Sequence, residues 1–151
     1  MSFQIKLSEV DKFGKDLVRP EGVMCLKDDT VWTSHDEGHC TRIAPDGSQR
    51  VVGEVGGEPN GICIDRDGSV IIANIGNGQV QRLFDDGRHE VITDSMDGRP
   101  MPTPNFPHVN SQGRIWVTNS TDLRRHFDVT RNPSSDGRLC RIENGQTRIL
   151  A

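Results

Sequence analysis

The sequence predicts an all-β protein with the fold of a partial β-propeller, built from four-stranded antiparallel blades. A hairpin pattern that starts with proline occurs three times, at Pro20, Pro59 and Pro104, and the second strand begins eleven residues later in each copy. Each hairpin is followed by a third strand, an Asp-Gly or Asn-Gly turn and a fourth strand. The prolines are 39 and then 45 residues apart, which is a spacing typical of propeller blades.

The N-terminal segment, residues 1–19, precedes the first blade unit. Residues 3–7 alternate apolar and polar side chains over the length of one strand, without a partner strand near them in the sequence. In propellers such a lone N-terminal strand often completes the last blade and closes the ring. We therefore expect residues 3–7 to form a ring-closing strand.

Three blade units follow, at about 20–53, 59–93 and 104–150. Their first strands lead up to Leu26, Ile64 and Val109. The later strands are expected at 31–34, 38–43 and 49–53 in the first unit, at 70–73, 78–83 and 89–93 in the second, and at 115–118, 137–142 and 146–150 in the third.

Two longer connections interrupt this repeat. Residues 94–103 contain two prolines before Pro104, which exclude a helix or a central strand there. The third unit carries an insertion at 121–136, which includes Arg124, Arg125 and His126. Long irregular loops are either functional or plain surface loops, so this insertion is either a lid over a pocket or a surface loop.

Three blades form about half of a six-bladed ring and cannot close, because propeller rings have at least four blades. The outer faces of the first and third units and their sheet edges would stay exposed, which favours association. We expect self-association or pairing with a complementary half-propeller.

Composition narrows the class of protein. The net charge of −4 argues against a nucleic-acid partner, which would require a basic face. The four cysteines lack zinc-finger spacing and fall on predicted strands, where we expect reduced thiols in the core or between blades. No apolar stretch is long enough for a membrane span or a signal peptide, so we expect a cytoplasmic protein without membrane contact.

Candidate functional residues stand just before the first strand of each unit, which lines the central channel of a propeller. Glu21, Asn60 and Asn105 hold this position and should converge on the channel mouth. Carboxylate and amide oxygens suit a hard divalent cation such as Ca²⁺ or Mg²⁺. The alternative is that an asparagine after proline caps its own turn, and for Asn60 this alternative remains open.

Two further residues are candidates for contacts with a substrate. His108 lies on the first strand of the third unit, where Met24 and Cys63 are its counterparts, and is either a buried core histidine or a pocket residue. Asn119 ends a second strand, as His35 and Asn74 do, and could reach a pocket rim. Polar residues are also ordinary at strand ends.

Taken together and with their spacing, several motifs carry a resemblance. They are Arg19–Val23, Pro59–Gly61, Thr103–Phe106 and Gly113–Thr118. The chain resembles the N-terminal half of the senescence marker protein, gluconolactonase and luciferin-regenerating enzyme family of six-bladed propellers. The resemblance implies hydrolysis of a sugar-type lactone by a metal-activated water.

In that family one divalent metal ion sits at the channel mouth, held by a glutamate of the first blade, asparagines of the third and fourth, and an aspartate of the fifth. The resemblance assigns the first two ligands to Glu21 and Asn105 and leaves Asn60 as a residue of the substrate pocket. The fourth-blade asparagine and the acid or base aspartate would lie beyond Ala151. The expected ion is Ca²⁺, with Zn²⁺, Mg²⁺ and Mn²⁺ as alternatives.

The sequence departs from the family pattern at two positions. Val23 stands where the family usually has proline, and Thr103 replaces an arginine that often precedes the third-blade asparagine. Two other functions stay open. One is a non-catalytic propeller fragment or binding scaffold, and the other is a propeller similar to streptogramin lyase, whose chemistry uses a histidine and Mg²⁺.

Overall fold

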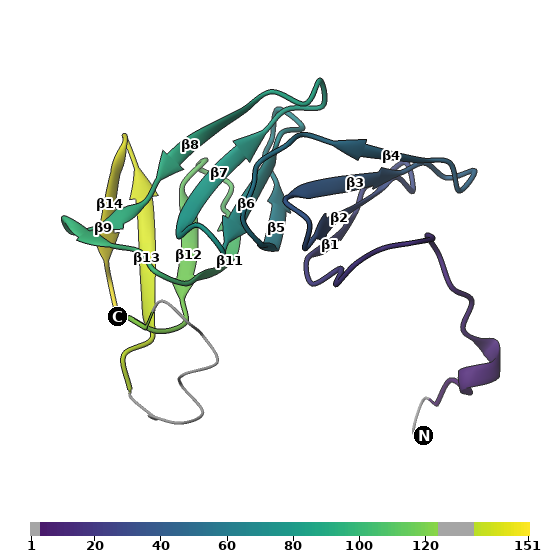
Figure 1. Cartoon of the computed structure of the whole chain (residues 1–151), viewed down its shortest axis with the longest axis horizontal. Helices are drawn as coiled ribbons and strands as arrows, with labels where there is room; N and C mark the ends of the chain where they lie inside the picture. Colours follow the sequence, from purple (N-terminus) through teal and green to yellow (C-terminus); the bar gives the residue numbers. More distant parts are fainter. Residues whose placement is uncertain (1–3, 124–134) are drawn as a thin grey trace.

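The computed structural model describes residues 4–123 and 135–151. In these ranges the regular structure consists of three four-stranded antiparallel sheets, one two-stranded hairpin and one short 3-10 helix, η1 (Leu7–Glu9). The three sheets stand next to one another in an open arc (Figure 1). Each sheet is a propeller blade, so the predicted all-β fold is confirmed.

The blades keep the predicted order of strands. Blade one contains β1 (Val23–Cys25), β2 (Val31–His35), β3 (His39–Ile43) and β4 (Gln49–Val52). Blade two contains β5 (Pro59–Ile64), β6 (Val70–Asn74), β7 (Gln79–Leu83) and β8 (His89–Thr93). Blade three contains β11 (Pro104–Val109), β12 (Ile115–Asn119), β13 (Arg138–Glu143) and β14 (Gln146–Ile149).

The tight turns between strands form at the Asp-Gly pairs, as the sequence predicts. In blade two the Asp67 side chain accepts a hydrogen bond from the Ser69 backbone N–H at 2.9 Å, and Gly68 between them has a φ of +85°. Asp46 and Ser48 repeat this arrangement in blade one. An aspartate that bonds two residues onward, followed by glycine in the left-handed region, makes a local turn that needs no further support.

Apolar cores fill both spaces between the blades. Val70 and Ile72 of β6 pack toward blade one, where they meet Trp32, whereas Ile71 of β6 packs toward blade three, where it meets Val117. Successive residues of a strand point to opposite faces, so a continuous apolar run is buried on both sides. Blade two is therefore the centre of the molecule.

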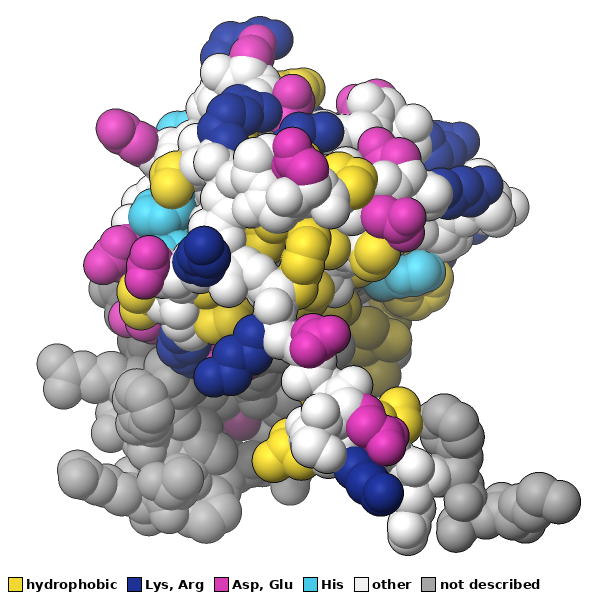
Figure 2. Space-filling model, turned by 90° about the vertical axis from the view of Figure 1, so that its right-hand side faces the viewer, with side chains coloured by type: hydrophobic (Ala, Val, Ile, Leu, Met, Phe, Trp, Pro, Cys, Tyr) yellow, Lys and Arg dark blue, Asp and Glu magenta, His cyan; other side chains and the backbone are white. Residues whose placement is uncertain are grey.

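No further blade among the described residues covers the two outer faces of the arc. On blade one the N-terminal segment lies over part of the outer face, because Gly14 packs against Ile43, which is 1% exposed. On blade one Val23 is 55% exposed and Val51 is 61% exposed. Val23 pairs with Thr33, which pairs with Thr41, which pairs with Val51, so all four lie on the face away from blade two. Figure 2, which views the blade-one side, shows hydrophobic side chains at the surface among charged ones. Phe106 and Leu139 are exposed on the opposite outer face, that of blade three.

The connection at residues 94–103 contains a small hairpin that the sequence analysis did not anticipate. β9 (Ser95–Met96) pairs with β10 (Arg99–Pro100) in a two-residue ladder. The hairpin and its flank place Met96 and Met101, each 1% exposed, against the core between blades two and three. Prolines therefore exclude a central strand here without excluding a short edge ladder.

The N-terminal segment differs from the prediction. Residues 4–6 form no strand and Leu7 begins η1, so the strand expected at 3–7 is absent from its described part. A strand needs a partner for its backbone groups, and residues 4–10 are exposed. Ring closure by this segment stays a prediction.

The insertion expected at 121–136 is described only at its two ends, and residues 124–134 lie outside the described residues. The ends are joined, because the Asp136 carboxylate accepts hydrogen bonds from the Thr121 hydroxyl and the Asp122 backbone N–H, both at 2.9 Å. The choice between a lid and a surface loop stays open.

The cysteines lie on strands as predicted and form no disulfide. Cys40, Cys63 and Cys140 are buried, and burial raises the pKa of the Cys40 thiol to about 12. Cys25 is exposed, which corrects the expectation that all four lie in the core or between blades. Within the described residues, no helix has the length and apolar character needed to cross a membrane.

Blade two should contribute most to stability because both of its faces are buried. Ile72→Ala removes a side chain that is 0% exposed and should lower the free energy of unfolding by about 2–5 kcal/mol. Val51→Ala, at a position that is 61% exposed, should change it by less than about 0.5 kcal/mol. Urea denaturation of both variants measures the difference, and equal losses would contradict the described packing.

Candidate functional site

The three residues expected at the channel mouth, Glu21, Asn60 and Asn105, lie at neighbouring loop tips. We call them the loop-tip residues. Gly22 packs on the next blade so closely that a Cβ there would lie 2.6 Å from the carbonyl oxygen of Asn60. A Cβ on Gly61 would overlap the carbonyl oxygen of Asn105. These close contacts bring the start of each first strand against the start of the next.

Asn60 links two of the tips directly. Its side-chain nitrogen donates a hydrogen bond to the backbone oxygen of Asn105 at 3.2 Å, and the residue is only 6% exposed. The Asn60 side chain therefore forms its hydrogen bond with the next blade. The turn-capping alternative would require a hydrogen bond to the backbone of its own turn. Its side-chain oxygen makes no hydrogen bond to any described residue.

Glu21 is held by a neighbouring arginine. The Arg19 guanidinium contacts the Glu21 carboxylate at 3.1 Å, Asp36 at 3.3 Å and Glu58 at 3.8 Å. These side chains are between about one third and one half exposed, so each pair adds little to stability. Arg19 therefore lies among three carboxylates, two from blade one and one from the connection to blade two.

The donor atoms at the loop tips suit a hard cation. They comprise the Glu21 carboxylate and the side-chain oxygens of Asn60 and Asn105, and the Asn105 side chain has no hydrogen bond within the described residues. Ca²⁺ takes six to eight oxygen ligands, so these residues fit the chemistry of such an ion but supply only part of its shell.

Asn119 has a structural role in the fold. Its side-chain oxygen accepts a hydrogen bond from the Thr103 N–H at 2.9 Å, and its nitrogen donates one to the Thr121 carbonyl at 2.8 Å. Asn74 does the same in blade two, where it accepts from the Glu58 N–H at 2.8 Å. Asn119 is 1% exposed, so contact with a substrate would require these hydrogen bonds to break.

His108 is exposed on β11, which corrects the interpretation of a buried core histidine. The registers confirm its counterparts, because Met24, Cys63 and His108 pair with Trp32, Ile71 and Trp116. Met24 and Cys63 pack in the interface with the following blade. No blade in the described part of the chain covers His108, which is exposed.

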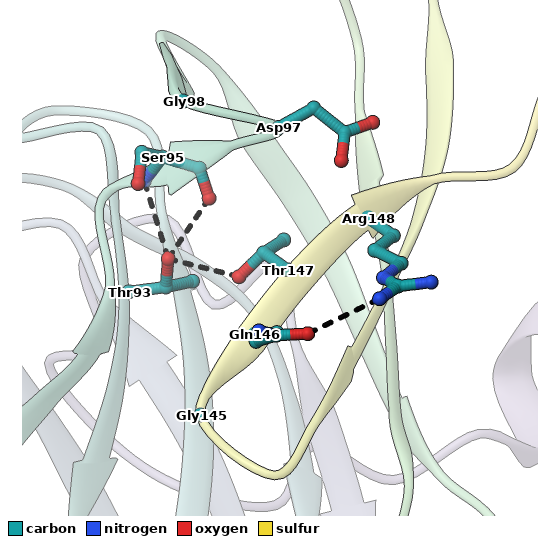
Figure 3. Close-up of a pocket in the computed structure, with 8 residues that line it drawn as sticks. All are labelled: Thr93, Ser95, Asp97, Gly98, Gly145, Gln146, Thr147 and Arg148. Carbon is teal, nitrogen blue, oxygen red and sulfur yellow. Dashed lines mark hydrogen bonds between the residues drawn. The ribbon is translucent and has the colours of Figure 1, made fainter.

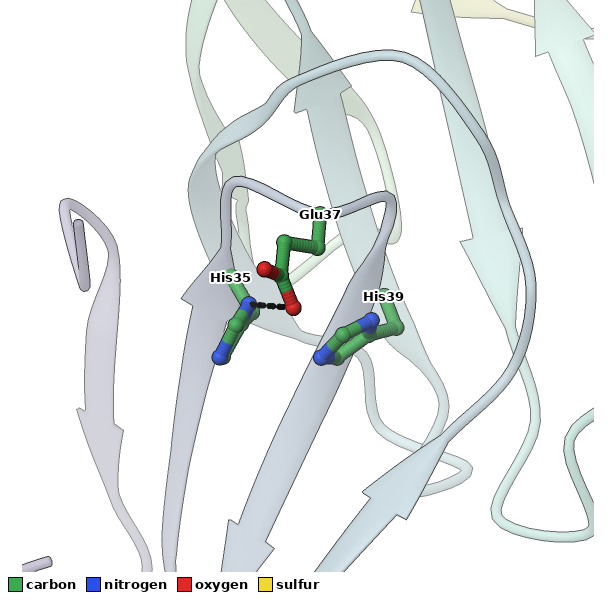
Figure 4. Close-up of side chains that lie close together, drawn as sticks. All are labelled: His35, Glu37 and His39. Atoms are coloured by element: carbon green, nitrogen blue, oxygen red, sulfur yellow. Dashed lines mark ion pairs between the residues drawn. The ribbon is translucent and has the colours of Figure 1, made fainter. Parts of the chain in front are cut away.

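One cluster escaped the sequence analysis. His35, Glu37 and His39 gather at the turn between β2 and β3, with one potential ligand atom from each within 4.8 Å of the others (Figure 4). The signal was the His-x-Glu-x-His spacing across a tight turn. His35 stands at the end of a strand, where polar residues are ordinary, so its position in the sequence does not single it out.

The surface also has hollows away from the loop tips. One, shown in Figure 3, lies between the end of β8, the β9–β10 hairpin and β14. Thr93 and Thr147 meet there through their hydroxyl groups at 3.0 Å. This hollow is at the outer strands and includes none of the five predicted site residues.

Comparison with solved structures identifies the fold. A gluconolactonase from Xanthomonas campestris superposes with a TM-score of 0.73 at 20% identity over 90% of this chain and 48% of that one. Virginiamycin B lyase from Staphylococcus aureus has a TM-score of 0.65 at 19% identity, over 88% and 41%. The PQQ-bound aldose sugar dehydrogenase from Streptomyces coelicolor has a TM-score of 0.65 at 17% identity, over 90% and 48%.

The chain is a partial β-propeller. It spans about half the length of the solved structures that it matches. No family model matches the sequence, and no curated protein does. The likeness therefore shows the fold, and the activities of these proteins are a basis for proposals only.

Alanine substitutions at the two asparagines of blade three should differ in their effect on the free energy of unfolding. Asn119→Ala leaves the Thr103 N–H and the Thr121 carbonyl without their partner, which should cost about 2–4 kcal/mol of unfolding free energy. Asn105→Ala removes no hydrogen bond made by that side chain and should cost less than about 0.5 kcal/mol. Chemical denaturation of both variants tests this, and a larger loss for Asn105→Ala would contradict the assignment.

Proposed function

We propose that this chain supplies the channel-mouth half-site of a metal-dependent hydrolase similar to gluconolactonase, which opens a sugar-type lactone. The observation that carries the proposal is the close approach of the backbone at the three loop tips, which hold Glu21, Asn60 and Asn105. Structural similarity to a gluconolactonase supports the same reading. The remaining ligands and the acid or base would come from further blades, in a longer chain or in a complementary half-propeller.

Each residue has a distinct role in this proposal. Glu21 and Asn105 hold the metal through their side-chain oxygens, and Arg19 fixes the Glu21 carboxylate at the tip. Asn60 sets the position of the Asn105 backbone through its 3.2 Å hydrogen bond, and its side-chain oxygen would be available to a substrate. When bound, the metal would polarise the lactone carbonyl as a Lewis acid.

Ca²⁺ is the first choice of metal because both ligand side chains, Glu21 and Asn105, offer oxygen, with Zn²⁺, Mg²⁺ and Mn²⁺ as alternatives. Glu21 contributes the one negative charge among the loop-tip residues. Low ligand charge and a partial shell correspond to the weak end of calcium sites, with a Kd on the order of 10⁻³ M for the isolated chain.

A lyase similar to streptogramin lyase is the second candidate function. The observation that favours it is the structural similarity to virginiamycin B lyase, together with an exposed histidine, His108, on the first strand of blade three. A non-catalytic binding scaffold is the third candidate, favoured by the open faces with Val51 and Phe106 exposed. These faces also suit self-association or a complementary half-propeller.

Calcium titration by calorimetry tests the proposed site. The wild-type chain should bind Ca²⁺ weakly and saturably, and Glu21→Gln should abolish the binding because it removes the charged ligand. Glu54→Gln, at another exposed glutamate, should bind as the wild type does. Binding that survives Glu21→Gln would contradict the proposal.

Activity assays separate the candidates. With Ca²⁺, Zn²⁺, Mg²⁺ or Mn²⁺ present, any hydrolysis of glucono-1,5-lactone above the buffer rate should disappear in Glu21→Gln. Opening of a cyclic depsipeptide instead of the lactone would favour the lyase, and retained lactonase activity in the variant would contradict the role of Glu21.

A further inference from the structure

The turn between β2 and β3 brings together three side chains that the proposed function does not use. His35 and His39 form the last cross-strand pair of the hairpin, and their rings stack with centroids 4.1 Å apart and an interplanar angle of 28°. Glu37 comes from the turn between them (Figure 4). Because directly paired residues project to the same face of a sheet, the hairpin itself fixes this meeting.

Two imidazoles and one carboxylate form a recognised ligand set for zinc. His35 Nδ1 lies 4.0 Å from Glu37 Oε2, and the three potential ligand atoms lie within 4.8 Å of one another. Atoms at such separations can converge on one ion with small side-chain rotations. Three protein ligands leave a fourth position of a tetrahedral ion for water.

An independent observation points to a ligand at this place. His35 is 4% exposed, and its Nδ1 has no hydrogen-bond partner anywhere in the described part of the chain. Buried polar atoms are usually paired, because an unpaired one loses its hydration without compensation. Nδ1 is also the atom that faces Glu37 (Figure 4).

The other blades show that the fold does not require this nitrogen. Asn74 and Asn119 end the second strands of blades two and three. Each accepts a hydrogen bond from a backbone N–H of the connection that precedes its blade. In blade one His35 Nε2 takes that role and accepts the Val18 N–H at 3.2 Å. Histidine thus replaces the amide oxygen and adds Nδ1, for which the repeat has no structural use.

The backbone offers an acceptor to the other tautomer of the His35 ring, at the loss of the hydrogen bond from Val18. Nε2 also lies 3.4 Å from the Asp16 carbonyl oxygen. When Nδ1 binds a metal, the ring proton resides on Nε2, which can then donate to Asp16 instead of accepting from Val18. Burial lowers the pKa of His39, and the charge of the nearby His35 lowers it further. A lowered pKa favours the neutral imidazole, which is the form that binds a metal.

We propose that His35, Glu37 and His39 form a transition-metal site, with Zn²⁺ as the expected ion. Nitrogen ligands distinguish it from the oxygen donors of the loop tips, so Ca²⁺ should not occupy it. Arg19 contacts both Glu21 and Asp36, which places the two sites at the same end of blade one. The metal would brace the hairpin that carries Asp36.

Calorimetric titration with Zn²⁺ alone tests this site, using tag-free protein in a Cys25→Ser background that removes the exposed thiol. The expected result is one Zn²⁺ per chain. His35→Asn and His39→Gln should each weaken binding by about tenfold or more, because each removes a metal ligand. His35→Asn restores the residue of the other two blades and should keep the fold, as circular dichroism would check.

Two matched variants complete the experiment. His89→Gln removes an exposed histidine on β8, and Glu54→Gln removes an exposed glutamate that belongs to neither proposed site, so both should bind Zn²⁺ as the background protein does. Absence of Zn²⁺ binding, or equal binding by folded His35→Asn, would overturn the proposal.

Discussion

The close approach of the first strands of neighbouring blades is the constraint on which the site depends. Gly22 meets the backbone of Asn60, and Gly61 meets the backbone of Asn105, at distances that exclude a side chain. Neither glycine has a positive φ, so space and not conformational freedom explains the residue type. Because these contacts come directly after the loop-tip residues, they determine how near the tips lie to one another. The apolar cores on both sides of β6 then hold the blades in this arrangement.

Much of the fold could be predicted because it is encoded locally and three times. The proline, the Asp-Gly turns and the alternating strands recur in register, so each copy supports the others. Elements outside the repeat were harder. The β9–β10 hairpin is too short to leave a pattern, and the segment at 4–7 alternates like a strand but has no partner strand among the described residues. A periodic sequence predicts strand formation only where a neighbour can accept its hydrogen bonds.

The candidate site was predictable in position but less so in detail. Repeat position alone placed Glu21, Asn60 and Asn105 at equivalent tips, whereas the bond from Asn60 to the next blade is a long-range contact. The burial of Asn119 and the exposure of His108 depend on which face each blade covers, and the sequence does not state this. The cluster around His35 follows from the pairing of His35 with His39, which a one-residue change of turn length would have removed. Its unpaired Nδ1 is visible only when every partner is known.

Two metal sites at the same end of blade one would give this blade a different chemistry from blades two and three. In those blades an asparagine oxygen accepts a hydrogen bond from the backbone of the preceding connection. In blade one His35 Nε2 accepts the equivalent hydrogen bond, and the ring carries a further nitrogen. The loop tips offer oxygen, and the hairpin beside them offers nitrogen and a carboxylate. The oxygen donors depend on the contact between first strands, whereas the β2–β3 hairpin alone brings His35 and His39 together.

The stability of Gly61→Ala compared with Gly137→Ala tests that contact most directly. A Cβ on Gly61 meets the backbone of the next blade, whereas on Gly137 the nearest atom is 3.4 Å away, and neither residue has a positive φ. Urea denaturation should show a loss of about 1–3 kcal/mol for Gly61→Ala and no loss or a small gain for Gly137→Ala. Equal stability of the two variants would contradict the close approach of the first strands and the convergence of the loop tips.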